Sequence, residues 1–425
     1  MNDFLKAFDK VIGYADEKRK LMPVCDIMRN PDKYKRLGVA MPSGALLQGE
    51  PGYGKTLMAK CFIEACGVPY FTCRKDKADG DFINHLKKCF DDAAASAPAI
   101  VFLDDMDKFA NEDHDHKNAE EYVAVQACID NVKGQDVFVI ATTNDLYNLP
   151  DSLLRAGRFD INLIICGLEA EDQIKLIRHF LEDKAFIEDV SPEEISQILG
   201  GGVSCAELEK IINDAAIKVA FENRDTVTRD DIILACLNQR FGGAECSVRP
   251  CEEKRVITAY HEAGHVVVSE ILSPNSINFA SIKAYRSTSN GLTSHVDMGY
   301  SDESFESRCN RVTGMLAGKA AIEIVFGTID MGARSDLWNA REYLERLRDQ
   351  SAAFGFEYQN DWSFSAKTQR NAEMVIIKEL NRHYAEAKNI LSANRPFLDA
   401  VAEALLAKET IFAADIADIK TALNL

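Results

Sequence analysis

The stretch "GALLQGEPGYGKT" (Gly44 to Thr56) joins a short apolar run to a glycine-rich loop. Its first residues predict a buried strand, and the continuation "GKTLMAKCFIEAC" predicts a helix. Between them, "GEPGYGKT" (Gly49 to Thr56) matches G-x-x-x-x-G-K-[S/T], the pattern of a phosphate-binding loop that leads from a strand into a helix. The stretch therefore predicts an α/β nucleotide-binding domain.

Each position of this loop has a physical role toward ATP. Glycines let backbone N–H groups wrap the phosphates at the start of a helix. We expect Lys55 to reach the β- and γ-phosphates and Thr56 to offer its hydroxyl to Mg²⁺. The predicted nucleotide-binding residues are Gly49, Glu50, Pro51, Gly52, Tyr53, Gly54, Lys55, Thr56, Leu57 and Asp104.

A second apolar run, "AIVFLDD" (Ala99 to Asp105), predicts a strand that ends at Asp104, close to the magnesium ion. The next position in such ATPases usually carries a glutamate that orients the attacking water. Asp105 stands there and is one methylene shorter, so the sequence supports nucleotide binding more firmly than hydrolysis. Asn144 ends a further strand, "DVFVIATTN", where its side chain can touch the γ-phosphate or the water.

Strands and helices alternate as far as Cys166, which predicts a parallel sheet covered on both faces. The patterns from Gly167 to Asn238 are helical only, and "QRFGGAECSVRPCEE" (Gln239 to Glu253) resembles a linker. Helical patterns dominate the rest, apart from a strand-like interlude at 277–297. We therefore expect an α/β nucleotide-binding domain at 1–166, a small helical domain at 167–238, a linker at 239–253 and a mainly helical domain at 254–425.

The last of these domains opens with "RVITAYHEAGHVVVSEIL" (Arg255 to Leu272), which contains H-E-x-x-H. On a helix, His261 and His265 share one face and can hold the same metal ion. Glu262 lies beside them and can act as a general base toward an attacking water. The flanking residues are apolar and helical, as the motif requires. The sequence thus predicts a catalytic zinc site.

A catalytic zinc ion needs a third protein ligand. The candidates are His295, Glu323 and Asp336. Asp336 lies in or near the first turn of a predicted helix, "GARSDLWNAREYLERLRD", where a carboxylate is stabilised. Glu323 lies within an apolar helical pattern and His295 within the strand-like interlude. The residue pattern favours Asp336 and leaves the other two open.

Composition limits the partners and the compartment. The net charge is −18, from 49 basic and 67 acidic residues, which argues against nucleic acid or an anionic membrane surface as the main partner. The 12 cysteines form no C-x-x-C pair and often lie in apolar runs, as reduced thiols of a cytoplasmic protein do. No apolar run approaches the roughly 18 residues of a membrane span. The start, "MNDFLKAFDK", lacks the layout of a signal peptide.

Together, these motifs resemble the FtsH-type AAA+ metalloproteases. "VIGYADEK", "VPYFT", "LLRAGRFD", "AYHEAGHVV" and "SDLWNA" follow one another in the family's order over nearly the whole chain. The resemblance implies an α/β P-loop AAA+ ATPase domain with a helical lid, followed by a mainly α-helical zinc metallopeptidase domain. It also implies a homohexameric ring in which ATP drives unfolding of protein or peptide substrates into a chamber of zinc sites.

By resemblance, Arg155 and Arg158 in "LPDSLLRAGRFD" match arginine fingers that reach a neighbouring subunit's γ-phosphate. His261, His265 and Asp336 match the zinc ligands, and Glu262 matches the catalytic base. The choice of Asp336 rests mainly on this resemblance.

The chain departs from the family in four ways. It starts directly at the ATPase domain, whereas members usually carry N-terminal membrane spans, and Asp105 replaces the usual glutamate. The first pore loop, "CRKDKADGDF" (Cys73 to Phe82), is short and charged, and its one aromatic, Phe82, is expected to belong to the following helix. "NEDHDHKNAE" (Asn111 to Glu120) replaces a glycine-rich second pore loop. We expect Lys75 and Lys77 to grip an extended substrate less well than an aromatic would, or to favour acidic segments.

Three functions are consistent with these features. The favoured one is an ATP-dependent zinc endopeptidase. A second is a peptidase ring that binds nucleotide mainly for assembly and hydrolyses it slowly. A third is a non-proteolytic remodeller or scaffold with a structural zinc site, and the intact Glu262 argues against it because a structural site has no use for a base.

Overall fold

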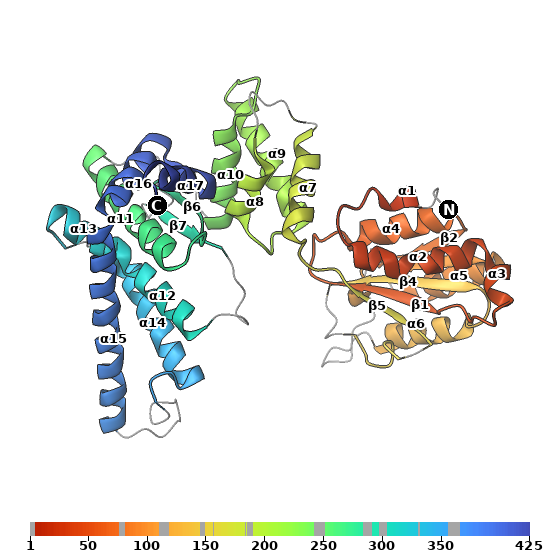
Figure 1. The fold of residues 1–425 in the computed structure, drawn as a ribbon. Helices are drawn as coiled ribbons and strands as arrows, with labels where there is room; N and C mark the ends of the chain where they lie inside the picture. The colour runs from red at the N-terminus through yellow and green to blue at the C-terminus, as the bar shows by residue number, and fades with distance from the viewer. Residues whose placement is uncertain are drawn as a thin grey trace. The chain divides into compact units, whose positions relative to one another are not determined.

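The computed structural model describes residues 5–75, 81–109, 119–144, 149–155, 157–182, 184, 190–241, 251–283, 291–296, 304–329, 332–355 and 366–425. The chain forms two compact units (Figure 1). The first comprises Met1–Ala185 and Gly201–Thr226, and the second comprises Phe186–Gly200 and Val227–Leu425. Residues 76–80 and 110–118, which include Lys77 and most of the second predicted pore loop, lie outside the described residues.

A five-stranded parallel sheet forms the centre of the first unit. Its order is β2-β3-β4-β1-β5, and every neighbouring pair is parallel. The strands are β1 (Gly44–Gln48), β2 (Tyr70–Cys73), β3 (Ala99–Leu103), β4 (Val137–Thr143) and β5 (Ile161–Ile164). All residues of β1, β3 and β4 are buried, as a sheet covered on both faces requires. The prediction of a parallel α/β domain is confirmed.

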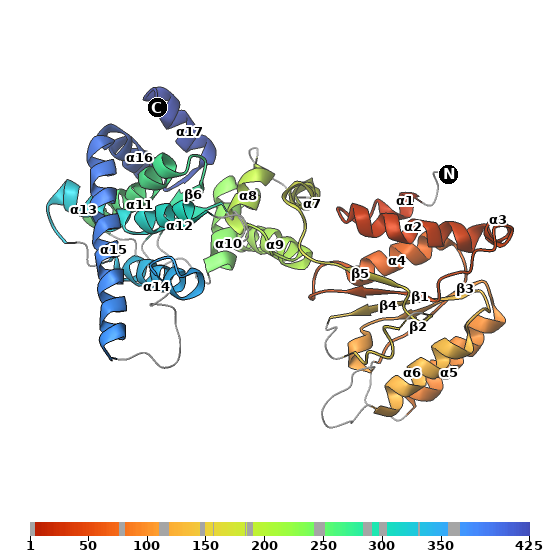
Figure 2. The same ribbon diagram turned by 60° about the horizontal axis from the view of Figure 1, so that its bottom comes forward.

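Helices cover both faces of this sheet (Figure 2). One face carries α1 (Leu5–Phe8), α2 (Ala15–Arg29) and α4 (Lys55–Cys66), and the other carries α5 (Phe82–Ala95) and α6 (Ala119–Asn131). Two short elements lie in the connections: α3 (Pro31–Lys35) follows α2, and the 3₁₀ helix η1 (Met106–Lys108) follows β3. The phosphate loop follows β1, and Asp104 and Asn144 follow β3 and β4, so all three lie at the carboxyl edge of the sheet.

The described part of residues 167–238 contains four helices and no strand, as predicted, and these helices divide between the two units. The first unit contains α7 (Ala170–Glu182) and α9 (Cys205–Phe221), and the second contains α8 (Pro192–Leu199) and α10 (Arg229–Phe241). Most of the predicted linker, residues 242–250, lies outside the described residues. The limits of the predicted domains stay predictions.

The second unit is mainly helical. Its central helix, α11 (Glu252–Leu272), packs against α13 (Ala317–Phe326) and α16 (Arg395–Lys408) around one apolar core. The remaining helices are α12 (Phe305–Met315), α14 (Arg334–Ser351), α15 (Ala366–Ala393) and α17 (Ala413–Ala422). The strand-like interlude contributes β6 (Ile277–Ser281) and β7 (Leu292–His295) to an antiparallel sheet of order β7-β6-β8, with β8 at Thr410–Phe412. Among the described residues, no helix is long and apolar enough to cross a membrane.

Candidate zinc and nucleotide sites

The two histidines of H-E-x-x-H meet Asp336 in the second unit. The Nε2 atom of His261 lies 3.1 Å from Oδ2 of Asp336 and 3.1 Å from Nε2 of His265. His265 Nε2 lies 3.5 Å from the same carboxylate oxygen. Ligand atoms around a tetrahedral zinc ion with N and O ligands are about 3.4 Å apart, so this donor set fits a divalent metal.

Two helices position these side chains. The four-residue spacing places both imidazoles on one face of α11, and Asp336 lies in the first turn of α14. Burial alone would raise the pKa of the Asp336 carboxyl, but hydrogen bonds and charge from His261 and His265 hold that pKa well below its usual range. Asp336 is therefore ionised, as a metal ligand must be.

The other two candidates for the third ligand have different partners. His295 Nε2 lies 3.0 Å from Ser269 Oγ, and burial, followed by the positive charges of His265 and Arg311, lowers the pKa of His295 to about 4. Glu323 accepts hydrogen bonds from Tyr384 Oη and, at 2.7 Å, from Lys388 Nζ. Within the described part of the second unit, Asp336 alone joins the two histidines in a metal-sized cluster.

Glu262 is buried beside this cluster. Thr293 Oγ1, on β7, donates a hydrogen bond of 2.7 Å to Glu262 Oε2. Burial raises the pKa of Glu262, while the charges of His261 and His265 and the bond from Thr293 act in the opposite direction. A raised pKa makes the carboxylate a stronger base, which suits the role of a general base.

Sequence reasoning missed the residues that support these side chains. The Gly314 carbonyl lies 2.8 Å from His265 Nδ1, which donates to it and leaves Nε2 with its lone pair toward the cluster. A Cβ atom on Gly318 would lie 2.6 Å from the Nε2 atoms of both histidines, and one on Gly291 would lie 2.5 Å from Glu262 Oε1. A glycine inside the apolar helix α13, where alanine is the better helix former, was the available signal for Gly318.

The structure brings the phosphate loop and Asp104 together in the first unit. Thr56 Oγ1 donates to Asp104 Oδ1 at 3.0 Å, and Thr142 Oγ1 donates to the same oxygen at 2.9 Å. Lys55 Nζ donates to the carbonyls of Gly49 and Glu50 at 2.7 and 2.6 Å. Lysine, hydroxyl and carboxylate thus lie at one end of the sheet, as ATP and Mg²⁺ binding requires.

Comparison with known proteins assigns a family to each part of the chain. Residues 45–166 match the AAA family, described as the ATPase family associated with various cellular activities, and residues 249–347 match peptidase family M41. The chain is 31% identical to the ATP-dependent zinc metalloprotease FtsH of Thermotoga maritima, over 95% of this chain and 71% of that protein. The chain belongs to the FtsH family.

Other members of the FtsH family are similar over the same length. The FtsH of Bacillus subtilis is 26% identical over 96% of this chain and 69% of its own length. The ATP-dependent zinc metalloprotease YME1L1 of Mus musculus is 30% identical over 96% of this chain and 59% of that protein. This chain therefore spans somewhat more than half the length of the YME1L1 proteins.

In this FtsH-family chain, Asp105 has an unusual backbone and two cationic neighbours. Its φ of 53° lies in the left-handed region, which aspartate tolerates better than most residues. Its Oδ2 atom lies 2.6 Å from Lys108 Nζ and 3.7 Å from Arg74 Nη2. The Asn144 backbone N–H donates to Asp107 Oδ1 at 3.0 Å. Both predicted water-orienting residues lie at the edge of the phosphate site.

The two predicted finger arginines differ in their surroundings. Arg155 is exposed, whereas Arg158 forms an ion pair of 2.6 Å with Asp130 and donates to the Ser152 carbonyl. Near the first pore loop, Phe82 begins α5 as expected, and its buried ring lies 4.8 Å from the ring of Phe109. The Phe82 side chain is therefore part of the core.

Proposed function

We propose that this chain is an ATP-dependent zinc metalloendopeptidase that acts on protein or peptide substrates. The observation that carries the proposal is the meeting of His261, His265 and Asp336 beside the buried carboxylate of Glu262. Its membership of the FtsH family supports the same conclusion.

The residues of the site have distinct roles in this proposal. His261, His265 and Asp336 would hold Zn²⁺, which would supply a Lewis acid toward the scissile carbonyl and the attacking water. Glu262 accepts a proton from that water and returns it to the leaving amine. Its bond from Thr293 fixes the carboxylate in the orientation that proton transfer requires.

The nucleotide residues have roles in the same proposal. Residues 49–57 hold the phosphates of ATP, and Thr56 and Asp104 hold Mg²⁺. The hydrogen bond between the Thr56 and Asp104 side chains supports this assignment. Asp105 and Asn144 orient the attacking water. Arg155 and Arg158 reach the γ-phosphate of the next subunit in a homohexamer, which the match to the AAA family supports.

The setting of the protein is also part of the proposal. The net charge of −18 supports protein rather than nucleic acid as its substrate. Among the described residues, eleven cysteines are free thiols. Because thiols stay reduced in the cytoplasm, this supports a cytoplasmic location.

The peptidase assignment is tested with Glu262→Gln. This variant keeps the shape of the side chain and removes the base, so cleavage of unfolded casein is expected to vanish while bound zinc is retained. Glu323→Gln is the matched control, because Glu323 lies on α13 and pairs with Lys388. Unchanged casein cleavage by Glu262→Gln would refute the assignment.

A second function, a peptidase ring that uses nucleotide mainly for assembly, is favoured by one observation. Asp105 is short, and its carboxylate already pairs with Lys108. Degradation of a folded and an unfolded substrate is compared with ATP, ADP and a non-hydrolysable analogue. The ATP-driven function predicts rapid loss of the folded substrate with ATP alone, and equal rates with all three nucleotides would favour the second function.

A further inference from the structure

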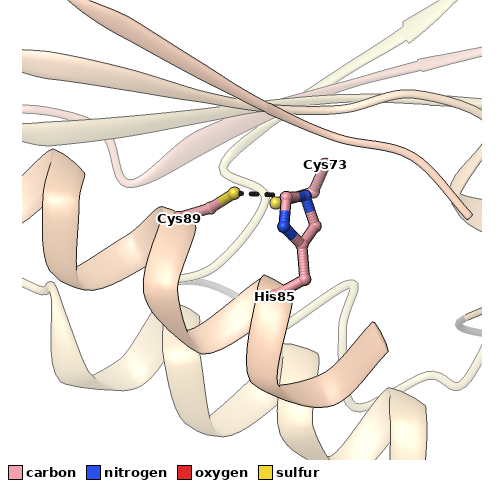
Figure 3. Close-up of side chains that lie close together, drawn as sticks. All are labelled: Cys73, His85 and Cys89. Atoms are coloured by element: carbon pink, nitrogen blue, oxygen red, sulfur yellow. Dashed lines mark hydrogen bonds between the residues drawn. The ribbon is translucent and has the colours of Figure 1, made fainter. Parts of the chain in front are cut away.

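Two thiols and an imidazole gather in the first unit. Cys73 ends β2, while His85 and Cys89 lie four residues apart on α5, which packs against that strand. Figure 3 shows the three side chains converging from the strand and the helix. Their donor atoms all lie within 4.8 Å of one another, and Cys89 Sγ lies 3.7 Å from His85 Nε2.

The 3.7 Å between Cys89 Sγ and His85 Nε2 suits a metal ion held by sulfur and nitrogen. Around a tetrahedral zinc ion, a thiolate sulfur and an imidazole nitrogen lie about 3.6 Å apart, and two thiolates about 3.8 Å apart. A set of two thiolates and one imidazole selects soft or borderline metals such as Zn²⁺ over Mg²⁺. We propose that Cys73, His85 and Cys89 bind a Zn²⁺ ion, in addition to the ion of the peptidase site.

The burial of the three residues gives this site a protected side and an open side. Cys73 is 0% and Cys89 is 7% exposed, within the core that α5 and α6 form on the sheet. His85 is exposed, so an ion can reach the thiols past the imidazole and keep its fourth position toward solvent. Cys128 belongs to the same core and is not part of the donor cluster. Cys128 is therefore an internal comparison: a buried thiol of this core that serves packing alone.

The site adjoins the ATPase carboxylates through one residue. Arg74 directly follows Cys73, and its Nη1 and Nη2 atoms lie 3.6 Å from Asp104 Oδ2 and 3.7 Å from Asp105 Oδ2. An ion that ties Cys73 to α5 therefore fixes the end of the strand from which Arg74 extends. Metal binding at this site is independent of the proposed peptidase activity.

Titration of the full, reduced chain with Co²⁺ tests the proposal. A thiolate-bound cobalt ion absorbs in the near ultraviolet by charge transfer, whereas the histidine and carboxylate ligands of the peptidase site give no such band. We expect a thiolate charge-transfer band in the wild-type chain and its loss in Cys89→Ser. His85→Gln, a change at an exposed position that leaves the core intact, should weaken cobalt binding about tenfold or more.

Two variants serve as controls. Cys128→Ser replaces a buried thiol of the same core, and Asp336→Ala removes a ligand of the peptidase site; both should keep the full band. Absence of the band in the reduced wild-type chain, or a band unchanged in both Cys89→Ser and His85→Gln, would overturn the proposal. A chain that shows no cobalt band when reduced, but forms a disulfide between Cys73 and Cys89 after mild oxidation, would also overturn the proposal. Mass spectrometry would detect that disulfide.

Discussion

Two imidazoles and a carboxylate can share one ion only where the neighbouring helix leaves room for their rings. Gly318 of α13 provides that room, since a Cβ atom there would lie 2.6 Å from His261 Cε1 and from the Nε2 atoms of both histidines. Real Cβ atoms do not approach other atoms so closely, and the rings cannot retreat while they hold the ion. The geometry of the site thus depends on a residue with no side chain.

We predict that Gly318→Ala lowers zinc content and peptide cleavage together. Alanine would favour the helix by about 1 kcal/mol through its higher propensity, so the helix itself should persist. The added methyl group displaces the imidazoles instead. Zinc per chain, measured by elemental analysis, checks this. Gly201→Ala, where a Cβ atom would meet nothing within 4 Å, should retain its zinc. Full zinc content in Gly318→Ala would show that the rings can adjust.

His295 gives a prediction about pH. Its pKa falls from 6.5 to about 4 in the folded chain, so the folded state keeps it neutral where the unfolded chain takes up a proton. Its contribution to stability is complete above pH 6.5 and is lost as the pH falls from 6.5 toward 4. The slope from this group is at most about 1.4 kcal/mol per pH unit. Urea unfolding over this range should be less dependent on pH in His295→Gln.

The control for this titration is His179→Gln, because the His179 side chain is 60% exposed and lies in the other unit. It should leave the dependence of stability on pH unchanged. Equal slopes for the wild-type chain and His295→Gln would mean that His295 titrates normally in the folded state.

At the residue scale, the sequence predicted what lies within one helix better than what lies between helices. The spacing of His261 and His265 was sufficient to place both imidazoles on one face of α11. Their contact with Asp336 depends on where α14 lies relative to α11. Residue spacing does not give that arrangement, so it could not exclude His295 or Glu323 as the third zinc ligand. The support from Thr293 and Gly318 was missed because neither residue type indicates a catalytic site by itself.

At the element scale, α9 and the phosphate loop form one joined structure within the first unit. Tyr53 Oη donates to the Gly202 carbonyl at 2.8 Å, and the Ala206 backbone N–H donates to the Gly52 carbonyl at 3.1 Å. A Cβ atom on Gly52 would lie 2.8 Å from Ser204 Oγ. The start of α9 therefore supports the loop directly.

Ser204 is the N-cap of α9 and forms a capping box with Glu207. We predict that Ser204→Ala destabilises the first unit by about 1 kcal/mol, a typical value for a lost cap, and also weakens nucleotide binding. Thermal unfolding and titration with a fluorescent ATP analogue measure the two effects. Ser191→Ala removes the equivalent cap of α8 and should leave nucleotide affinity unchanged. If Ser204→Ala bound the nucleotide as tightly as Ser191→Ala, the cap of α9 would have no role in nucleotide binding by the phosphate loop.

The strands of the first unit were predictable in proportion to their burial. The central strands β1, β3 and β4 are continuous apolar runs, and the sequence predicted all three. The edge strands β2 and β5 are partly exposed and four residues long, which leaves too short a pattern to distinguish from a loop. The residues of β8 (Thr-Ile-Phe) favour a strand, but a run of three is too short to predict one, and its partner β6 is far away in the sequence.

At the scale of the whole molecule, the proposed hexamer predicts that subunits complement one another. Lys55→Ala removes a phosphate contact within a subunit, and Arg155→Ala removes a finger for its neighbour, so each variant alone should lack ATPase activity. Rings mixed in equal parts should regain it at about a quarter of their sites, where an Arg155→Ala subunit receives the finger of a Lys55→Ala neighbour. Steady-state ATP turnover of the mixture measures this.

Mixing must follow dissociation of the rings, and a mixture of Lys55→Ala with Lys55→Ala,Arg155→Ala subunits is the control, since it contains no intact phosphate loop. No recovery in the first mixture, from subunits that assemble normally, would place the action of Arg155 within its own subunit.

The glycines along α11 and α13 also matter to anyone who tries to make this protein resistant to heat. A Cβ atom on Gly264 would lie 2.6 Å from the Ala317 carbonyl, so both helices carry a glycine where they approach. Replacing glycine by alanine in helices is a standard route to a higher melting temperature. In this protein, the same replacement at Gly318 should lower the proposed peptidase activity. Variants selected for heat resistance alone should keep Gly264, where a methyl group would clash with backbone atoms of α13, but not Gly318, whereas variants selected for heat resistance and proteolysis together should keep both glycines.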